Sequence, residues 1–197
     1  MCGICGIIGE VEHREKVLEQ MMNRIIHRGP DDAGTHEKGK AALGFRRLSI
    51  IDLEHGHQPM YNEDGDVVIV FNGEIYNHME VRQELLEKGH VFRNNSDTEC
   101  LVHAYEEYKE GMLSRLRGMF GFAIWDEREQ QLFMARDFFG IKPVYYSVID
   151  GCLVFGSEIK SILEFPGYKK EVNLQALDQY LSYQYSVLPE TFFKGIY

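Results

Sequence analysis

The chain has 197 residues, of which 44% are hydrophobic and 12% aromatic, a composition typical of a folded domain with a sizeable core. Its formal net charge of −10 argues against a nucleic-acid-binding protein, and no stretch approaches the roughly 18 apolar residues of a membrane span. Residues 1–10 lack the basic start of a signal peptide, and four cysteines do not make a secreted disulfide scaffold. We therefore expect a reduced, cytoplasmic protein that binds neither nucleic acid nor membrane.

The first half of the chain combines strands with one amphipathic helix. Residues 2–9 alternate Cys or Ile with Gly, which predicts a buried strand that other backbone can approach closely. Residues 14–28 predict a helix with an apolar stripe, and residues 28–32 end it in a turn. Residues 41–52 and 66–72 predict two further strands. The helical stripe consists of Val17, Leu18, Met21, Met22, Ile25 and Ile26.

The second half begins with two helices and ends in strands. Residues 77–90 predict a helix that stops at Gly89. Residues 96–108 predict a second helix, because Ser96 and Glu99 have the spacing of a capping box. Turn residues separate the strands that follow at short intervals, which predicts an antiparallel meander. These strands cover residues 118–126, 131–137, 143–149 and 152–158.

The order of these elements indicates the fold class. Strands are grouped rather than alternating with helices, which favours an α+β layered fold with antiparallel sheets. We find no internal repeat or linker and expect residues 1–197 to form one domain. Because residues 188–197 still have the pattern of a strand, we also expect the chain to be a piece of a longer protein.

The spacing of Cys2 and Cys5 has three interpretations. A redox pair is disfavoured, because both lie in a predicted strand, where residues 2 and 5 point to opposite faces. A zinc knuckle lacks its second ligand pair: Cys100 and Cys152 stand alone, and none of the eight histidines provides a suitable pair near a cysteine. We therefore predict no metal site. Burial as a small hydrophobic residue fits Cys5 but does not explain the position of Cys2.

Cys2 gains its chemistry from its position. Methionine aminopeptidases remove Met1 when the next residue is small, which leaves a thiol and a free α-amine on one residue. Such an amine has a pKa of about 7.7–8.0, so near neutral pH it can act as general base for the neighbouring thiol. Gly3 and Gly6 leave room for a substrate around the sulfur. A chain that keeps Met1 is expected to be inactive, because its Cys2 nitrogen is an amide.

A series of motifs spans the whole chain in a fixed order. Each is weak alone, but together they resemble the glutaminase domain of class II, N-terminal-nucleophile glutamine amidotransferases, and most closely that of the glutamine-hydrolysing asparagine synthetase family. The motifs are MCGICGIIG (1–9), HRGPDDAG (27–34), FRRLSIID (45–52), FNGEIYNH (71–78), SDTE (96–99), GMFGFAIWD (118–126), RDFFGIKPVYY (136–146) and GSEIKSIL (156–163).

The resemblance implies a fold and a reaction. The family fold is a four-layer αββα sandwich of two antiparallel sheets, of the Ntn-hydrolase type. The reaction is hydrolysis of L-glutamine to glutamate and ammonia through a thioester on Cys2. In the complete family enzyme a synthetase domain uses ATP, Mg²⁺ and this ammonia to convert aspartate to asparagine, and its pyrophosphate-binding loop is absent here. We therefore expect L-glutamine and a synthetase domain as partners and no cofactor for this domain; a homodimer stays open.

The resemblance also assigns residues to the α-carboxylate and the α-ammonium group of glutamine. Arg47 would bind the carboxylate, and its neighbour Arg46 is the alternative. Backbone groups around Leu48 and Ile50 would line the same pocket. Glu74 and Asp97 would accept hydrogen bonds from the ammonium group. Asp97 has an alternative role, since an acidic residue at a helix start also compensates the helix dipole.

Asn72 and Gly73 are assigned to the oxyanion hole of the tetrahedral intermediate, which needs fixed neutral donors. An Asn-Gly pair is also a hairpin-turn signal. Several charged residues in turn-rich segments are expected to order loops around the pocket without being catalytic. These are Arg28, Asp31, Arg136, Asp137 and Lys142.

Two alternatives to the asparagine synthetase resemblance stay open. The first is the glutaminase domain of another class II amidotransferase, such as the glucosamine-phosphate-forming or phosphoribosylamine-forming types. The motifs FNGEIYNH and GIKPVYY argue against it. The second is a non-catalytic domain of the same fold. The presence of five site residues argues against it: Cys2, Arg47, Asn72, Gly73 and Asp97.

Overall fold

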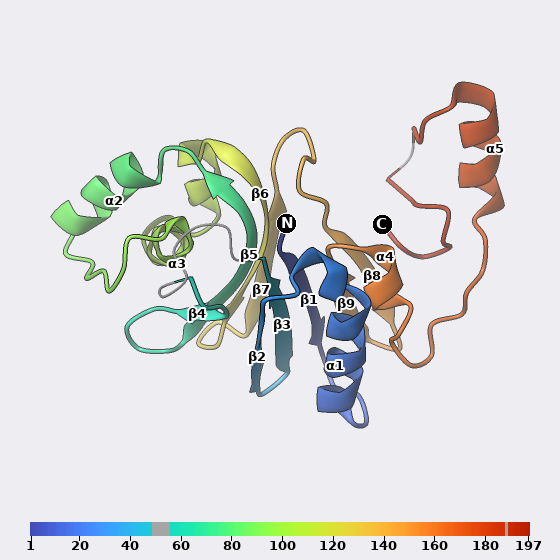
Figure 1. Cartoon of the computed structure of the whole chain (residues 1–197), viewed down its shortest axis with the longest axis horizontal. Helices are drawn as coiled ribbons and strands as arrows, with labels where there is room; N and C mark the ends of the chain where they lie inside the picture. Colours follow the sequence, from blue (N-terminus) through green and yellow to red (C-terminus); the bar gives the residue numbers. More distant parts are fainter. Residues whose placement is uncertain (49–55, 188) are drawn as a thin grey trace.

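The computed structural model describes residues 1–48, 56–187 and 189–197, and its strands form two antiparallel sheets (Figure 1). The strands are β1 (Gly3–Ile8), β2 (Asp32–Lys38), β3 (Ala41–Arg47), β4 (Met60–Tyr61), β5 (Val67–Ile75), β6 (Gly118–Asp126), β7 (Gln131–Arg136), β8 (Tyr145–Ile149) and β9 (Cys152–Gly156). Within the described residues, one sheet has the order β2-β3-β1-β9-β8 and the other the order β4-β5-β6-β7.

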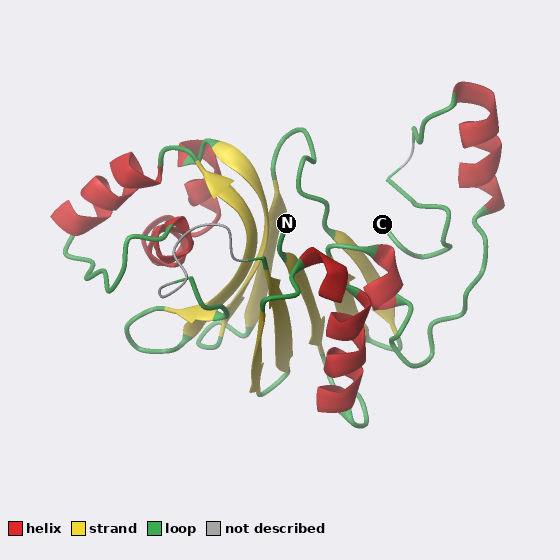
Figure 2. Ribbon diagram, in the orientation of Figure 1, coloured by secondary structure: helices red, strands yellow, loops and turns green. Residues whose placement is uncertain are grey.

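Helices cover the outer faces of both sheets (Figure 2). The helices are α1 (Arg14–Arg24), α2 (His78–Glu87), α3 (Asp97–Tyr108), α4 (Ile159–Ile162) and α5 (Leu174–Tyr183), with 3₁₀ turns at Ile26–Arg28 and Lys109–Arg115. Helices α1 and α4 pack on the sheet that contains β1, and α2 and α3 pack on the sheet that contains β5. The predicted α+β class and the four-layer αββα sandwich are therefore confirmed.

The core consists of three apolar layers, one between the sheets and one under each pair of helices. The layer between the sheets contains Ile4, Phe45, Val70, Trp125 and Phe155, all buried. Burying a large apolar side chain contributes roughly 1.5–3 kcal/mol before entropic costs, so this layer is a main source of stability.

Side-chain alternation along β1 separates the two N-terminal cysteines as predicted. Cys2 packs at the edge of the core between the sheets together with Ile4, whereas Cys5 and Ile7 lie in the layer under α1. Because the two thiols point to opposite faces of one strand, they cannot form a disulfide with each other. Both are free thiols in the structure.

The predicted meander over 118–158 is wrong. β6 pairs with β7 in one sheet, and β8 pairs with β9 in the other, so these strands form two separate hairpins. The crossing between the sheets starts at Asp137, whose carboxylate accepts four backbone hydrogen bonds of 2.9 to 3.2 Å. Burial raises the pKa of this carboxyl, but these bonds outweigh it and lower the pKa below its ordinary value. The donors are the N–H groups of Phe120, Phe139, Ile141 and Lys142.

The predicted boundaries of α2 and α3 agree closely with the structure. Gly89 has φ 96° just after α2, as a helix stop requires. The capping box at the start of α3 is only half formed. Ser96 Oγ accepts the N–H of Glu99 at 3.2 Å, but the Glu99 carboxylate accepts the N–H groups of Arg93 and Asn94 instead of that of Ser96.

Three other predictions need correction. Ile26 is 46% exposed, because α1 ends at Arg24 and the following 3₁₀ turn rotates this side chain outward. Residues 189–197 form no strand, although Tyr197 exchanges two backbone hydrogen bonds with Tyr146 at the edge of β8. The sequence analysis also missed β2, β4, α4 and α5.

Helix α5 stands apart from the sandwich, whereas the C-terminal residues return to it and bury Ile196 in the layer under α1 (Figure 1). Among the residues of α5 only Ala176 is buried, and Leu174 and Leu181 are 74% and 73% exposed. None of the helices in the described residues combines the length and the apolar character needed to cross a bilayer.

Candidate active site

One cavity of about 300 Å³ opens where the ends of β1, β3 and β5 meet the start of α3. It brings together every predicted site residue that the structure describes; Ile50 lies outside the described residues, in the masked range 49–55. The predicted residues that line the cavity are Cys2, Arg47, Leu48, Asn72, Gly73, Glu74 and Asp97.

Strand alternation explains why these side chains converge. Along β1, β3 and β5 the residues Ile4, Phe45 and Val70 point into the core between the sheets. Side chains two positions further along a strand point the same way, which places Arg47 and Asn72 on the same faces of β3 and β5. The cavity is therefore the polar end of the layer between the sheets.

The Cys2 thiol points at a backbone carbonyl of the cavity wall. Its Sγ lies 3.9 Å from Leu48 O, a distance that fits a weak hydrogen bond to sulfur. Met1 also lines the cavity, and its Sδ lies 3.3 Å from Lys142 Nζ. With Met1 attached, the Cys2 nitrogen is a peptide nitrogen, so removal of Met1 would create the amine and widen the cavity.

A buried arginine anchors the backbone of Cys2. Arg28 Nε donates to Cys2 O at 2.9 Å, and Arg28 Nη1 lies 3.1 Å from Glu158 Oε1. Burial raises the pKa of Glu158, but hydrogen bonds from Lys160, His27 and Arg28 outweigh it and bring the pKa to about 2. The carboxylate therefore stays charged near neutral pH and holds Arg28 against the first strand.

Arg47 is buried at the cavity wall, and Arg46 is not part of that wall. Gly56 packs against the Arg47 guanidinium: a Cβ at this position would lie 2.5 Å from Nη2 and 3.0 Å from Cζ. Because only glycine leaves this space, the guanidinium is held in a tight slot. Its planar fork can donate two parallel hydrogen bonds to a carboxylate.

Among the described residues, no strand covers the edge of β5 beyond β4, and this edge directs a backbone donor toward the cavity. β4 pairs only with the beginning of β5, at Val68 and Ile69. Further along this edge, the Gln58 side chain binds both backbone groups of Phe71, and Asp97 Oδ2 accepts the N–H of Ile75 at 3.0 Å. Alternate residues of a strand direct their backbone groups the same way, so the N–H of Gly73, midway between them, points to the same open side.

Asn72 supplies a second donor beside this backbone group. Its side chain is buried, and its Nδ2 has no hydrogen-bond partner among the described residues. A buried amide without a partner costs free energy, so it indicates a position that a ligand oxygen can fill. Asn72 and Gly73 lie inside β5 and pair with Gly121 and Phe120 of β6. The hairpin-turn alternative is therefore wrong.

The two carboxylates of the cavity lie at different depths. Glu74 is exposed, and Asp97 is half-buried at the first position of α3, after the N-cap Ser96. Burial raises the pKa of Asp97, and nearby Glu74 raises it further, although N–H groups of Ile75 and Thr98 act against the shift. A cation bound between these carboxylates would relieve both effects, and the position at the start of α3 also fits compensation of the helix dipole.

Sequence reasoning missed other residues that line the cavity. Gly56 and Gln58 act through packing and backbone pairing, and neither has a signal in the sequence beyond its place near a proline. Lys142 was assigned to loop architecture and lies at the cavity wall. Within the described residues, the cavity wall contains no group of three or more His, Cys, Asp or Glu side chains close enough to hold a metal ion.

Comparison with known proteins defines the family. A family model described as the glutamine amidotransferase domain matches residues 1–197, so the chain belongs to the glutamine amidotransferase family. Glutamine phosphoribosylpyrophosphate amidotransferase from Bacillus subtilis shares the fold with a TM-score of 0.71 at 23% identity, over 87% of this chain and 45% of that one.

Within this family the chain is similar to asparagine synthetases. It is 45% identical to glutamine-hydrolyzing asparagine synthetase 1 of Bacillus subtilis over 97% of this chain and 31% of that protein. An asparagine synthetase of Zea mays is 44% identical over 82% of this chain and 28% of its own length. The chain thus spans about a third of the length of these relatives, and the predicted resemblance to the glutaminase part of asparagine synthetase is confirmed.

Proposed function

We propose that this chain hydrolyses L-glutamine to glutamate and ammonia through a thioester on Cys2. The observation that carries this proposal is the convergence of complementary groups on one cavity of about 300 Å³. A thiol, a buried guanidinium, an unpartnered amide donor and two carboxylates match the amide, carboxylate and ammonium groups of glutamine. Membership of the glutamine amidotransferase family supports the same reaction.

Binding orients the amide of glutamine before any bond changes. In the proposed complex Arg47 binds the α-carboxylate through two parallel hydrogen bonds, with the backbone near Leu48 beside it. Glu74 and Asp97 accept hydrogen bonds from the α-ammonium group. With both ends of the amino acid fixed, the side-chain amide lies at Cys2, which converts a bimolecular reaction into one within the complex.

The proposed reaction starts once Met1 has been removed. The free α-amine of Cys2 takes the thiol proton, and Sγ attacks the amide carbon of glutamine. The protonated amine then passes its proton to the nitrogen that leaves as ammonia, and a γ-glutamyl thioester remains on Cys2. A water molecule hydrolyses this thioester, which releases glutamate and restores the thiol. No cofactor is needed for these steps.

Asn72 and Gly73 would stabilise the charge that develops on the amide oxygen. The Asn72 Nδ2 atom is buried without a partner, and the Gly73 N–H lies on the open edge of β5. Both donors are fixed before the substrate binds, which is what transition-state stabilisation requires. Removing one such donor typically reduces the rate by about 10²–10³.

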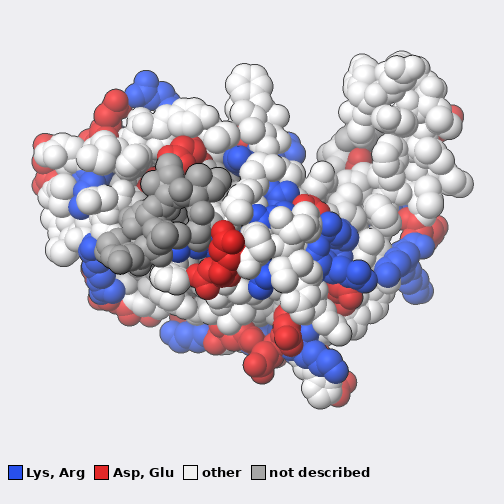
Figure 3. Space-filling model, viewed as in Figure 1, with Lys and Arg blue, Asp and Glu red and all other residues white. Residues whose placement is uncertain are grey.

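We further propose that the chain is the glutaminase part of a longer, cytoplasmic asparagine synthetase. Its relatives by that name are about three times longer. The exposed apolar side chains of α5 and the nearly uncharged lobe that it forms (Figure 3) fit a surface that another domain covers. That domain would use ATP, Mg²⁺ and aspartate. The charge of −10 supports the absence of nucleic-acid partners.

The test is a glutaminase assay on the chain after Met1 removal, with ammonia and glutamate measured together. We expect equal amounts of both products and no activity in Cys2→Ala. Arg47→Lys keeps the charge but loses the planar fork, so we expect a higher KM. If the parent chain and Cys2→Ala produce ammonia at the same rate, the proposal is wrong and the domain binds without turnover.

A further inference from the structure

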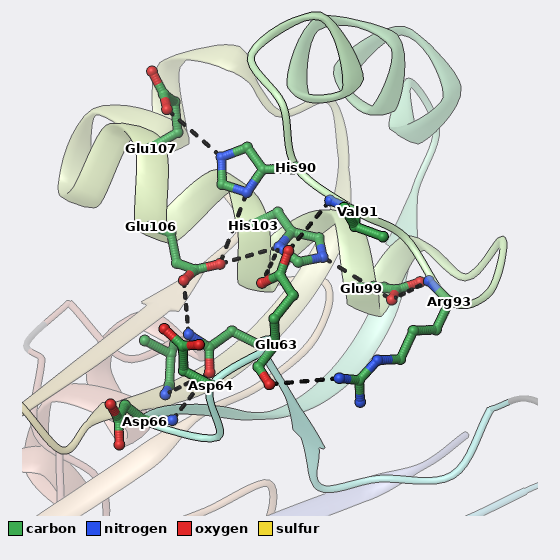
Figure 4. Close-up of polar contacts among 12 residues, drawn as sticks. Glu63, Asp64, Asp66, His90, Val91, Arg93, Glu99, His103, Glu106 and Glu107 are labelled. Carbon is green, nitrogen blue, oxygen red and sulfur yellow. Dashed lines mark hydrogen bonds and ion pairs between the residues drawn. The ribbon is translucent and has the colours of Figure 1, made fainter.

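Four potential metal ligands meet in the helical layer outside the sheet that contains β5 (Figure 4). Glu63 comes from the turn between β4 and β5, His90 from the segment just after α2, and His103 and Glu106 from one face of α3. One ligand atom from each side chain lies within 4.8 Å of the others. We call these residues the two-histidine cluster; none of them lines the cavity described above.

The spacing of the ligand atoms fits a tetrahedral metal ion. His103 Nδ1 lies 3.0 Å from Glu106 Oε2 and 3.5 Å from Glu63 Oε2. His90 Nδ1 lies 3.9 Å from Glu106 Oε2. Four ligands at about 2.0–2.2 Å from a tetrahedral zinc ion lie about 3.3–3.6 Å from one another. Small side-chain rotations are therefore enough to close the cluster around one ion.

A further carboxylate lies near the second ring nitrogen of each histidine. His90 Nε2 lies 3.6 Å from Glu107, and His103 Nε2 lies 4.0 Å from the buried carboxylate of Glu99. A ring whose Nε2–H points at a carboxylate keeps its Nδ1 lone pair free for a metal, which is the usual arrangement of metal-binding histidines. The rings also pack together, with centroids 5.0 Å apart.

A hydrogen bond also fixes one oxygen of each ligand carboxylate. Asn62 Nδ2 donates to Oε1 of Glu106 at 2.7 Å, and the N–H of Val91 donates to Oε1 of Glu63 at 3.2 Å. In both side chains the fixed oxygen leaves the other one, Oε2, directed at His103.

Within the described part of the chain, the cluster leaves one buried polar atom, on His103, without a hydrogen-bond partner. His103 is buried, and its Nε2 has no hydrogen-bond partner among the described residues. A metal bound at Nδ1 would place the proton on Nε2, facing Glu99, and so turn the 4.0 Å approach into a useful electrostatic contact. Two carboxylates and two neutral imidazoles would also balance the charge of a divalent ion.

We propose that Glu63, His90, His103 and Glu106 form a structural Zn²⁺ site. Mixed imidazole and carboxylate donors in a four-coordinate arrangement suit zinc, and a site closed by four protein ligands is structural rather than catalytic. The ion ties α3 to the end of α2 and to the turn before β5. Asp97 lies at the start of the same helix, so the site steadies the helix that carries part of the cavity wall.

The sequence analysis considered cysteine-based metal sites and therefore did not consider this cluster. His103 and Glu106 have the i, i+3 spacing that places two ligands on one helical face, but Glu63 and His90 join them only through the tertiary fold. Neither partner is identifiable from local sequence spacing.

The test is a titration of metal-free protein with Zn²⁺, followed by calorimetry and thermal unfolding. A Cys2→Ala background removes the terminal thiol as a competing ligand. We expect one equivalent to bind and the midpoint of unfolding to rise with Zn²⁺ concentration. Co²⁺ should give the intense visible absorption of a four-coordinate ion. The absence of saturable binding by the folded chain would overturn the proposal.

Two variants show whether this cluster is the site. His90→Gln and Glu106→Gln should each weaken Zn²⁺ binding more than about 100-fold, beyond the loss expected for an outer partner such as Glu107→Gln. His13→Gln and Glu110→Gln change the same residue types at exposed positions and should bind as the parent does. Circular dichroism without metal checks that each variant is folded. Unchanged affinity in folded His90→Gln would contradict the proposal.

Discussion

Gln58 pairs with both backbone groups of Phe71: its Nε2 donates to Phe71 O at 3.2 Å, and its Oε1 accepts the Phe71 N–H at 2.6 Å. The side chain thus continues the edge pairing of β5 beyond Met60, the first residue of β4. The next residue is Asn72, a proposed oxyanion donor. We therefore expect Gln58 to act on the reaction by positioning this part of β5, without being a donor to the substrate itself.

Gln58→Glu keeps the shape of the side chain but removes its donor. A carboxylate would then face Phe71 O, and one hydrogen bond, worth about 0.5–1.5 kcal/mol, would be lost. We expect kcat to fall about tenfold, with KM changed less, because the oxyanion donors shift. Gln131→Glu on the exposed side of β7 is the control. An unchanged kcat in folded Gln58→Glu would exclude this positioning role.

Gly56→Ala tests the slot that holds Arg47. The new Cβ would lie 2.5 Å from Arg47 Nη2, and the flexible end of the arginine would move to avoid it. Since Arg47 is proposed to bind the carboxylate in ground state and transition state alike, we expect KM to rise about tenfold with kcat nearly unchanged. Gly111→Ala, where an added Cβ meets nothing within 4 Å, is the matched control. A fall in kcat alone would assign Arg47 a different role.

The raised pKa of Asp97 predicts how glutamine binding depends on pH. Protonation removes the acceptor for the α-ammonium group, so kcat/KM should fall on the acid side at a pH above the ordinary range of about 3.9 for aspartate. Asp97→Asn should lower kcat/KM and remove this acid limb. An unchanged acid limb in Asp97→Asn would show that another group titrates there.

The same shift has a consequence for stability. An acid whose pKa is higher in the folded than in the unfolded state binds its proton more tightly when folded, so its contribution is favourable below the unfolded pKa and is lost as pH rises through the folded pKa. Near pH 7, Asp97→Asn should therefore raise the midpoint of thermal unfolding. The amide can still accept the N–H of Ile75. A lower midpoint would mean that the carboxylate stabilises the fold.

The pKa of Glu158 is shifted in the opposite direction, so its contribution to stability depends on pH with the opposite sign. Its pKa falls from the ordinary 4.5 to about 2 in the folded chain, so its contribution to stability is present above pH 4.5 and is lost as pH falls toward 2. Glu158→Gln should flatten the dependence of urea unfolding on pH in this window. Glu84→Gln, at an exposed position of α2, should keep the parent slope. Equal slopes in parent and Glu158→Gln would refute the assigned pairing with Lys160, His27 and Arg28.

The part of the site that follows strand periodicity could be predicted from the sequence. Arg47 and Asn72 continue faces that Phe45 and Val70 bury, and a period of two residues carries that information along each strand. Motifs from the family then supplied the roles. The contributions of Gln58 and Gly56 could not be predicted in this way, because both depend on which segments meet in space.

The fold was predictable at the level of elements and less so at the level of topology. Alternation identified β6 and β9, but pairing partners depend on where the chain crosses between sheets, and that crossing depends on the Asp137 turn. The exposed strand β2 was missed because its polar side chains lack an apolar face. Helix α5 was missed although its apolar positions have a helical period.

The central claim is that Cys2 is a nucleophile only when its own amine is free. The most direct measurement is covalent labelling by a glutamine-mimicking electrophile such as 6-diazo-5-oxo-norleucine, followed by peptide mass spectrometry. The chain without Met1 should be labelled once, at Cys2, with protection by L-glutamine and no effect of Cys5→Ser. A form in which Met1 stays attached should react at least 100-fold more slowly, by roughly the loss expected when a general base is removed. Equal labelling of both forms, or labelling at another residue, would contradict the account.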